Sequence, residues 1–198
     1  MKWYAVVPVS IVHTVFGVFC VMIFAVLETM SLSNFGNLSL FGGVFLMPFY
    51  YFAVSKLFKS DIYKTFDIFT ICIIFTLMCS RINCIHSGCC KGMVIPGTEG
   101  LRWPTREAEI VFYIVLLIWL GRKVKAGKSR GELYPLYMLS YGIFRFIDEF
   151  FRVSESRTLF HISHLWSVLA FCIGMSVYVE IKRRNFPDLR LHKAGRKR

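Results

Sequence analysis

The sequence predicts an all-α integral membrane protein, a polytopic bundle of about six transmembrane helices with both termini in the cytoplasm. The chain of 198 residues is 56% hydrophobic, and only 18% of its residues are charged. A soluble domain would carry about 25% charged residues. Apolar runs also recur along the chain, and a transmembrane helix needs about 20 such residues, or fewer when flanking side chains snorkel.

Six apolar runs mark the expected spans. They are Val7–Leu27, Leu38–Ser55, Phe66–Ser80, Glu109–Leu120, Leu133–Phe151 and His161–Ile181. The first run is long and has no basic segment before it, so we expect it to remain as a span rather than to be a cleaved signal. The fourth run is the shortest, so it would be tilted, re-entrant or extended into its polar flanks.

The connections between these spans are short except for Arg81–Glu107, which contains four glycines and two prolines. This composition predicts a connection rich in turns. Long connections are also where functional residues tend to be placed.

The chain has a net charge of +12, and the positions of its basic residues predict its orientation in the membrane. Thirteen of the 24 lysines and arginines lie in two clusters, Arg122–Arg130 and Lys182–Arg198. The positive-inside pattern places both clusters in the cytoplasm and Arg81–Glu107 outside. We therefore expect residues 1–181 to form one transmembrane domain and residues 182–198 a basic cytoplasmic tail. Such a tail would also suit a nucleic-acid arm, but membrane lipids already explain it, so no nucleic-acid partner is expected.

Charged residues inside the fifth span are the strongest indication of a site. Arg145, Glu149 and Arg152 have the spacing i, i+4 and i+7, which puts them on one face of a helix. A charge at membrane depth costs at least a few kcal/mol unless it is paired or hydrated. Two interpretations remain open: an ion network that neutralises itself, and a site for an anionic ligand gripped by arginines.

A second concentration of reactive residues is the segment NCIHSGCCKG, which holds Cys84, His86, Cys89 and Cys90. Three cysteines and a histidine could bind zinc, but the familiar ligand spacings are absent, so no metal site is assigned. A disulfide from Cys84 to Cys89 or Cys90 is compatible with an outer location. A nucleophilic cysteine is a further possibility, because Arg81 and His86 would lower a thiol pKa.

Two of these segments resemble one protein family. RINCIHSGCCKG (Arg81–Gly92) resembles the arginine-led signature of prolipoprotein diacylglyceryl transferases, in the branch whose motif continues through Gly-Cys-Cys. YGIFRFIDEFFR (Tyr141–Arg152) resembles the penultimate-helix motif of the same family. The pair Gly42-Gly43 falls where the family has its double glycine, although helix packing would also explain it. The resemblance runs from about Val15 to Ile181.

The resemblance implies an enzyme of lipoprotein biosynthesis that works without a cofactor. It would move a diacylglyceryl group from phosphatidylglycerol to the lipobox cysteine of a prelipoprotein signal peptide, at the outer face of the bacterial cytoplasmic membrane. By resemblance, Arg81 and Arg145 would neutralise the lipid phosphate, and Glu149 would hold Arg145 in place. The other implied substrate-binding residues are Asn83, Gly42, Gly43, Arg152 and His86.

The sequence also departs from the family pattern. Phe41 stands where the family often has a histidine proposed as a base, and His86, His161 or His164 could replace it. The first span aligns with the family's second helix, so the chain resembles a shortened, divergent member that lacks the first helix. Two other functions therefore stay open: a non-catalytic protein that binds lipids or lipoprotein precursors on the same scaffold, and a small anion transporter.

Overall fold

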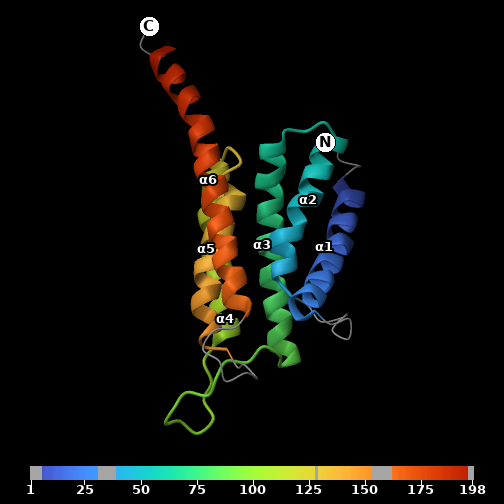
Figure 1. Cartoon of the computed structure of the whole chain (residues 1–198), viewed down its shortest axis with the longest axis vertical. Helices are drawn as coiled ribbons and strands as arrows, with labels where there is room; N and C mark the ends of the chain where they lie inside the picture. Colours follow the sequence, from blue (N-terminus) through green and yellow to red (C-terminus); the bar gives the residue numbers. More distant parts are fainter. Residues whose placement is uncertain (1–5, 31–38, 128, 153–161, 196–198) are drawn as a thin grey trace.

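The computed structural model describes residues 6–30, 39–127, 129–152 and 162–195, and it confirms the all-α prediction. The described residues form six helices and no strand. These are α1 (Val6–Thr29), α2 (Phe41–Leu57), α3 (Ile62–Ser87), α4 (Thr105–Lys125), α5 (Leu133–Glu149) and α6 (Ile162–Gly195). Figure 1 shows them running along the long axis of the molecule, with α1, α2 and α3 on one side and α5 and α6 on the other.

Three helices are long and apolar enough to cross a membrane, over Ile11–Glu28, Ile62–Ser87 and Ile162–Arg184. The apolar α2 is shorter, at 17 residues. The fold is therefore that of a helical membrane bundle. The helices α4 and α5 are not among them, because α4 has charged residues at both ends, and α5 has 17 residues and carries the charged residues of the motif.

The fourth helix extends well beyond the predicted span Glu109–Leu120. It begins at Thr105 and ends at Lys125, so its polar flanks continue the helix at both ends. Its middle presents an apolar outer face, where Val111 and Val115 are each about 60% exposed. Such a face suits contact with lipid, so the structure favours the extended form among the three arrangements expected from the sequence.

Glycines set the closest helix contacts. A Cβ atom on Gly142 of α5 would lie 2.7 Å from the carbonyl oxygen of Ser167 in α6, and one on Gly174 would lie 2.9 Å from Cβ of Met138. A Cβ atom on Gly42 would overlap the backbone of α1. Small residues at these positions let the backbones approach, as is common between membrane helices.

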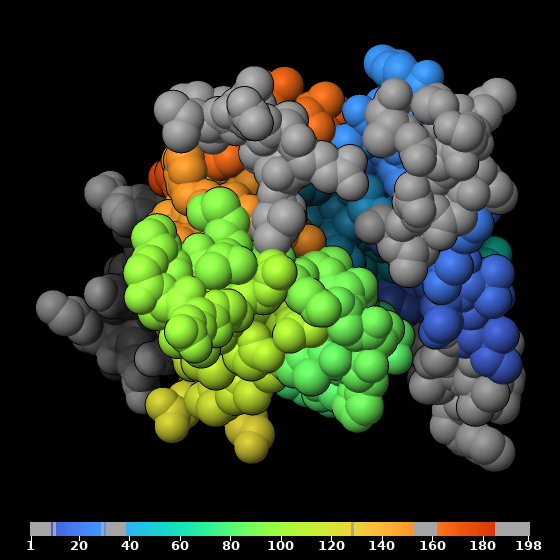
Figure 2. Space-filling model, turned by 90° about the horizontal axis from the view of Figure 1, so that it is seen from below, coloured from blue at the N-terminus to red at the C-terminus, as the bar shows by residue number. Residues whose placement is uncertain are grey.

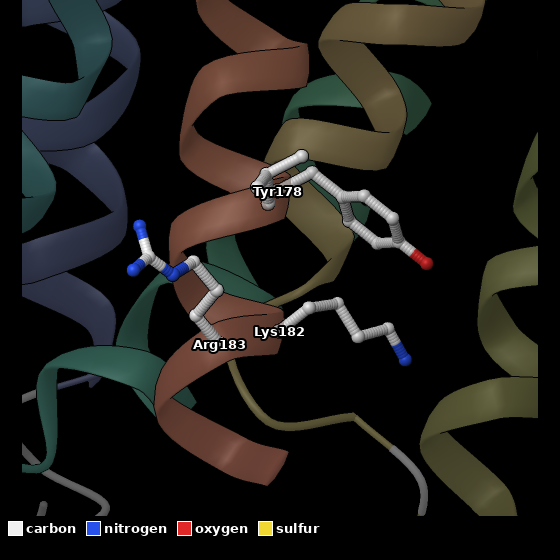
Figure 3. A pocket seen from close by; sticks show the side chains of 4 residues that line it. Tyr178, Lys182 and Arg183 are labelled. Carbon is white, nitrogen blue, oxygen red and sulfur yellow. The ribbon is translucent and has the colours of Figure 1, made fainter.

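A buried carboxylate ties α3 to the start of α5. Asp67 accepts hydrogen bonds from the backbone N–H groups of Gly131 and Leu133, at 2.9 and 3.1 Å. This end of the bundle also carries the basic residues that the charge pattern placed in the cytoplasm. A shallow hollow there is lined by Tyr178, Lys182 and Arg183 of α6. In Figure 3, Tyr178 and Lys182 extend from one side of α6 and Arg183 from the other.

The last helix continues without a break from Ile162 to Gly195, across residue 182, where the sequence predicted the tail to begin. Lys182 is not free in solvent, because its Nζ atom lies 3.1 Å from a carboxylate oxygen of Glu132. Residues 196–198 of the predicted tail lie outside the described residues. The cytoplasmic location of the termini stays a prediction.

Candidate active site

A cavity of about 560 Å³ opens at the end of the bundle opposite the basic residues. The helices α3 and α5 end there, and α2, α4 and α6 begin there. Figure 2 views the molecule from this end, where the end of α3 and the connection after it lie beside the end of α5, with α1 across from them. The cavity is lined by three arginines (Arg81, Arg145 and Arg152), which we call the arginine cluster.

One carboxylate joins the arginine cluster. Glu109 of α4 is 1% exposed, and its Oε2 atom forms an ion pair with Nε of Arg81. Its Oε1 atom lies 3.4 Å from Nη1 of Arg145 and 3.4 Å from Nη1 of Arg152. The two guanidinium groups that the resemblance assigned to one phosphate therefore converge on the same cavity, although they lie on α3 and α5.

Two further carboxylates hold Arg145 from its own helix. Asp148 lies 3.2 Å from Nη1, and Glu149 lies 2.6 Å from Nη2. Together with Glu109 they form what we call the acid shell. The predicted pairing of Arg145 with Glu149 is present, because the spacing i, i+4 puts both side chains on one face of α5.

Position distinguishes the two sets of charges. The arginine cluster lines the cavity, whereas no member of the acid shell does. The three acids compensate three cations that would otherwise be costly to bury. They do so from outside the cavity wall, where the three arginines outnumber the one carboxylate among the described lining residues, Glu28 of α1.

The connection between α3 and α4 fixes the outer end of α5. The N–H group of Met93 donates a hydrogen bond of 2.8 Å to the carbonyl of Phe151, and Gly92 pairs with Arg152 in an isolated antiparallel bridge. Gly92 also needs to be a glycine, because a Cβ atom there would overlap the carbonyl of Trp103. These contacts fix the backbone at Arg152, whose side chain lines the cavity.

Three thiols share the cavity with the arginine cluster. The Sγ atoms of Cys84, Cys89 and Cys90 all lie within 4.8 Å of one another, and all three residues line the cavity as free cysteines. Nη1 of Arg81 lies 3.8 Å from Sγ of Cys84. A hydrogen bond of 3.2 Å with the hydroxyl of Ser87 is the main cause that lowers the pKa of the Cys89 thiol.

Several residues implied by the resemblance lie outside the cavity wall. Asn83 and His86 are exposed on the last turns of α3. Nδ1 of His86 lies at hydrogen-bond distance, 3.0 Å, from the carbonyl oxygen of Ile82. Gly42 and Gly43 are buried, the first against α1 and the second near α3, where an added Cβ atom would lie 3.4 Å from the side chain of Ile73.

The alternative His164 does not line the cavity either. The ring of His164 is 3% exposed and packs against the rings of Phe146 and Phe150. His161 lies outside the described residues. At the position where the family often has a histidine, Phe41 lines the cavity and contacts the ring of Tyr141 edge-on.

The sequence did not predict that Glu109 would contact all three arginines, or that Tyr141 would line the cavity. The signal for Glu109 was an acid placed in an apolar run, a location that is costly unless the acid is paired. Tyr141 is 1% exposed, lines the cavity and makes no hydrogen bond through its hydroxyl to any described residue. That hydroxyl is therefore buried without a hydrogen-bond partner, on a residue that lines the cavity.

Comparison with known proteins agrees with this geometry. The sequence matches the prolipoprotein diacylglyceryl transferase family over residues 3–180. This chain belongs to that family. A curated relative, phosphatidylglycerol--prolipoprotein diacylglyceryl transferase 2 of Clostridium perfringens (strain 13 / Type A), is 31% identical over 88 residues. That match covers 36% of this chain and 33% of the relative, so it spans about a third of the relative's length. The resemblance seen in the sequence is thus confirmed, and the chain is a multi-pass membrane protein of this transferase family.

Proposed function

We propose that this protein transfers a diacylglyceryl group from phosphatidylglycerol to the cysteine thiol of a prelipoprotein lipobox, at the outer face of a bacterial cytoplasmic membrane. The observation that carries the proposal is the convergence of the arginine cluster on one cavity at the predicted outer end of the bundle. Family membership supports the same reaction.

The proposed reaction requires charge neutralisation more than any other contribution from the protein. The acceptor sulfur forms a bond to the glyceryl carbon, and the carbon–oxygen bond to the phosphate breaks as glycerol phosphate leaves. Guanidinium groups held in advance stabilise the charge that develops on the departing phosphate. The cavity volume of about 560 Å³ lies within the range of small-ligand sites and suits a glycerophosphate head group.

The contacts suggest a division of roles among the site residues. Arg81 and Arg145 would bind the phosphate, and Arg152 would contact the head group at the rim. Glu149 would keep Arg145 oriented through its contact of 2.6 Å. Gly42 and Gly43 would act through the helix packing that positions Phe41.

Asn83 and His86 have a different relation to the substrate. Both side chains are exposed beside the cavity and not in its wall. We propose that they contact the peptide acceptor and not the lipid phosphate. Substitution of either residue should then change the apparent affinity for the peptide more than that for phosphatidylglycerol.

The test is product analysis with the full chain. Purified protein in phosphatidylglycerol nanodiscs is mixed with a lipobox peptide, and mass spectrometry detects the added diacylglyceryl thioether. Removing one preorganised cationic group should lower the rate by about 10²–10³-fold in Arg81→Ala and in Arg145→Ala. Arg122→Ala is the matched control, because Arg122 is exposed at the other end of α4.

The possible outcomes separate the three functions. Because removal of a buried charge can unfold the bundle, Arg81→Lys is the second variant: lysine keeps the positive charge but cannot grip a phosphate with a planar fork. Normal turnover in folded Arg81→Ala would refute the assignment of Arg81. Phosphatidylglycerol binding without any product would favour a non-catalytic scaffold. Anion flux in liposomes that Arg145→Ala abolishes would favour a transporter.

A further inference from the structure

Three thiols in the cavity wall have no role in the proposed phosphate site. Cys84 is on the last turns of α3, and Cys89 and Cys90 follow that helix directly. Their sulfur atoms lie within 4.8 Å of one another. Zinc binds thiolate sulfur at about 2.3 Å, so two sulfurs of a tetrahedral site are about 3.8 Å apart. A shift of about 1 Å or less would bring the three sulfurs to that spacing.

The backbone is shaped to bring these sulfurs together. Gly88 and Cys90 have positive φ angles of 69° and 53°, which turn the chain back toward α3. A left-handed conformation at a residue other than glycine costs about 1 kcal/mol or more and persists only where the surroundings hold it. Nη1 of Arg106 holds the turn by donating to the carbonyls of Cys84 and Cys89, at 3.3 and 3.4 Å.

The cavity wall offers little choice of a group that could take the proton from an acceptor thiol. Among the described residues of its wall, Glu28 is the one carboxylate and there is no histidine. A metal ion solves this problem, because a thiol that binds zinc is deprotonated outright. The spacing of the cysteines in the sequence argued against zinc, but the folded backbone removes that objection.

We propose that Cys84, Cys89 and Cys90 bind a zinc ion whose fourth position takes the thiol of the peptide acceptor. This role for the metal rests on the proposed function. The acceptor thiol loses its proton to water when its sulfur binds zinc. The sulfur lone pair then forms the bond to the glyceryl carbon, and the electron pair of the broken carbon–oxygen bond stays on the leaving phosphate.

Charge and position are both compatible with this assignment. Three thiolates and one Zn²⁺ ion carry a net charge of −1, and the guanidinium group of Arg81 lies 3.8 Å from Sγ of Cys84. The zinc site and the arginine cluster share one cavity. The nucleophile would therefore be generated beside the place where the phosphate is held, which favours reaction by proximity.

Metal binding is measured on the full chain in detergent, first with zinc and then with Co²⁺ as a spectroscopic probe. We expect one zinc per chain by elemental analysis and a sulfur-to-cobalt charge-transfer band. Cys84→Ser, Cys89→Ser and Cys90→Ser should each weaken zinc binding at least about tenfold. Cys79→Ser is the matched control, because Cys79 is exposed on α3 and outside the cluster.

The fourth position is tested with the peptide. A lipobox peptide should change the visible cobalt bands, and the same peptide with serine in place of the cysteine should not. Equal zinc content in the wild type and in the triple serine variant would overturn the site, as would a disulfide among the three thiols in protein isolated without reductant. Cobalt absorption bands that do not change when the thiol peptide is added would overturn the proposal that the acceptor thiol binds the metal.

Activity separates this inference from the proposed function. Protein stripped of metal by a chelator that still forms the thioether at the full rate would overturn the zinc role and leave the transfer reaction standing. Cobalt protein that binds the thiol peptide but never yields a thioether would support the metal site and contradict the transferase.

Discussion

The substitution Glu109→Gln tests the arrangement of charges most directly. Glu109 is buried and contacts all three members of the arginine cluster. Glutamine has nearly the same shape, so the change removes one negative charge without opening a void. The network then has three cations and two anions, and one positive charge is buried without compensation.

The expected loss of stability is large. Each of the two guanidinium contacts at 3.4 Å is worth about 5 kcal/mol before desolvation, at an effective dielectric constant of 20. Because much of this gain only offsets desolvation, breaking a buried pair costs about 3–5 kcal/mol net. For a chain of this size, that loss lowers the unfolding temperature by roughly 6–20 °C.

The assay is thermal unfolding in detergent, followed by intrinsic tryptophan fluorescence. Glu107→Gln is the control, because Glu107 is half exposed on the same helix and has one ion pair of 3.7 Å, which is worth less than about 1 kcal/mol. Phosphatidylglycerol should stabilise Glu109→Gln more than the wild type, since an anion in the cavity restores the missing charge. Equal unfolding temperatures for the two variants, or equal stabilisation by the lipid, would refute this account of the network.

Three further substitutions probe other parts of the structure. Gly42→Ala should destabilise the fold by about 1–3 kcal/mol through overlap with α1, whereas Gly121→Ala, with no atom within 4 Å, should not destabilise it; equal unfolding temperatures would contradict this. Tyr141→Phe should weaken phosphatidylglycerol binding about 10- to 100-fold in native mass spectrometry with unchanged thermal stability, and unchanged affinity would exclude its hydroxyl from the site. Asp67→Asn should lower the free energy of unfolding by about 2 kcal/mol, because a neutral amide replaces the charged acceptor of two backbone hydrogen bonds; a change under about 0.5 kcal/mol in denaturant titration would show that the two bonds contribute little.

The helices could be predicted from the sequence because apolar runs of membrane length have few alternatives to helix. The ends of the helices were predicted less well: α3 extends beyond the predicted Phe66–Ser80, and α4 extends beyond Glu109–Leu120 into its polar flanks, one of the arrangements expected. The fourth helix shows the reason. Its first turn contains three charged or polar residues, and its last turn is basic. Such residues end an apolar run without ending a helix, since arginine, lysine and glutamate are good helix formers. Hydropathy therefore locates the apolar middle of a span better than its ends.

The site was predictable where its geometry is local. The pairing of Arg145 with Glu149 follows from the helical repeat, so four residues of separation were enough to infer it. The contact of Arg81 with Glu109 joins two helices across a long connection, and nothing in the composition sets the register between them. The convergence of the cysteine sulfurs depends on two positive φ angles, at Gly88 and Cys90. The spacing of the three cysteines in the sequence had argued against a common site.

The two interpretations of the charged span turn out to be compatible. A network of three arginines and three acids can be neutral as a whole and still present one sign of charge to a ligand, if the acids stay behind the arginines. The structure has that asymmetry, with the acid shell outside the cavity wall and the arginine cluster in it. Neutrality lets the cations persist at membrane depth without a bound anion. Under the proposed function, asymmetry would let them act on the phosphate, so the network that stabilises the bundle would also prepare it for an anionic head group.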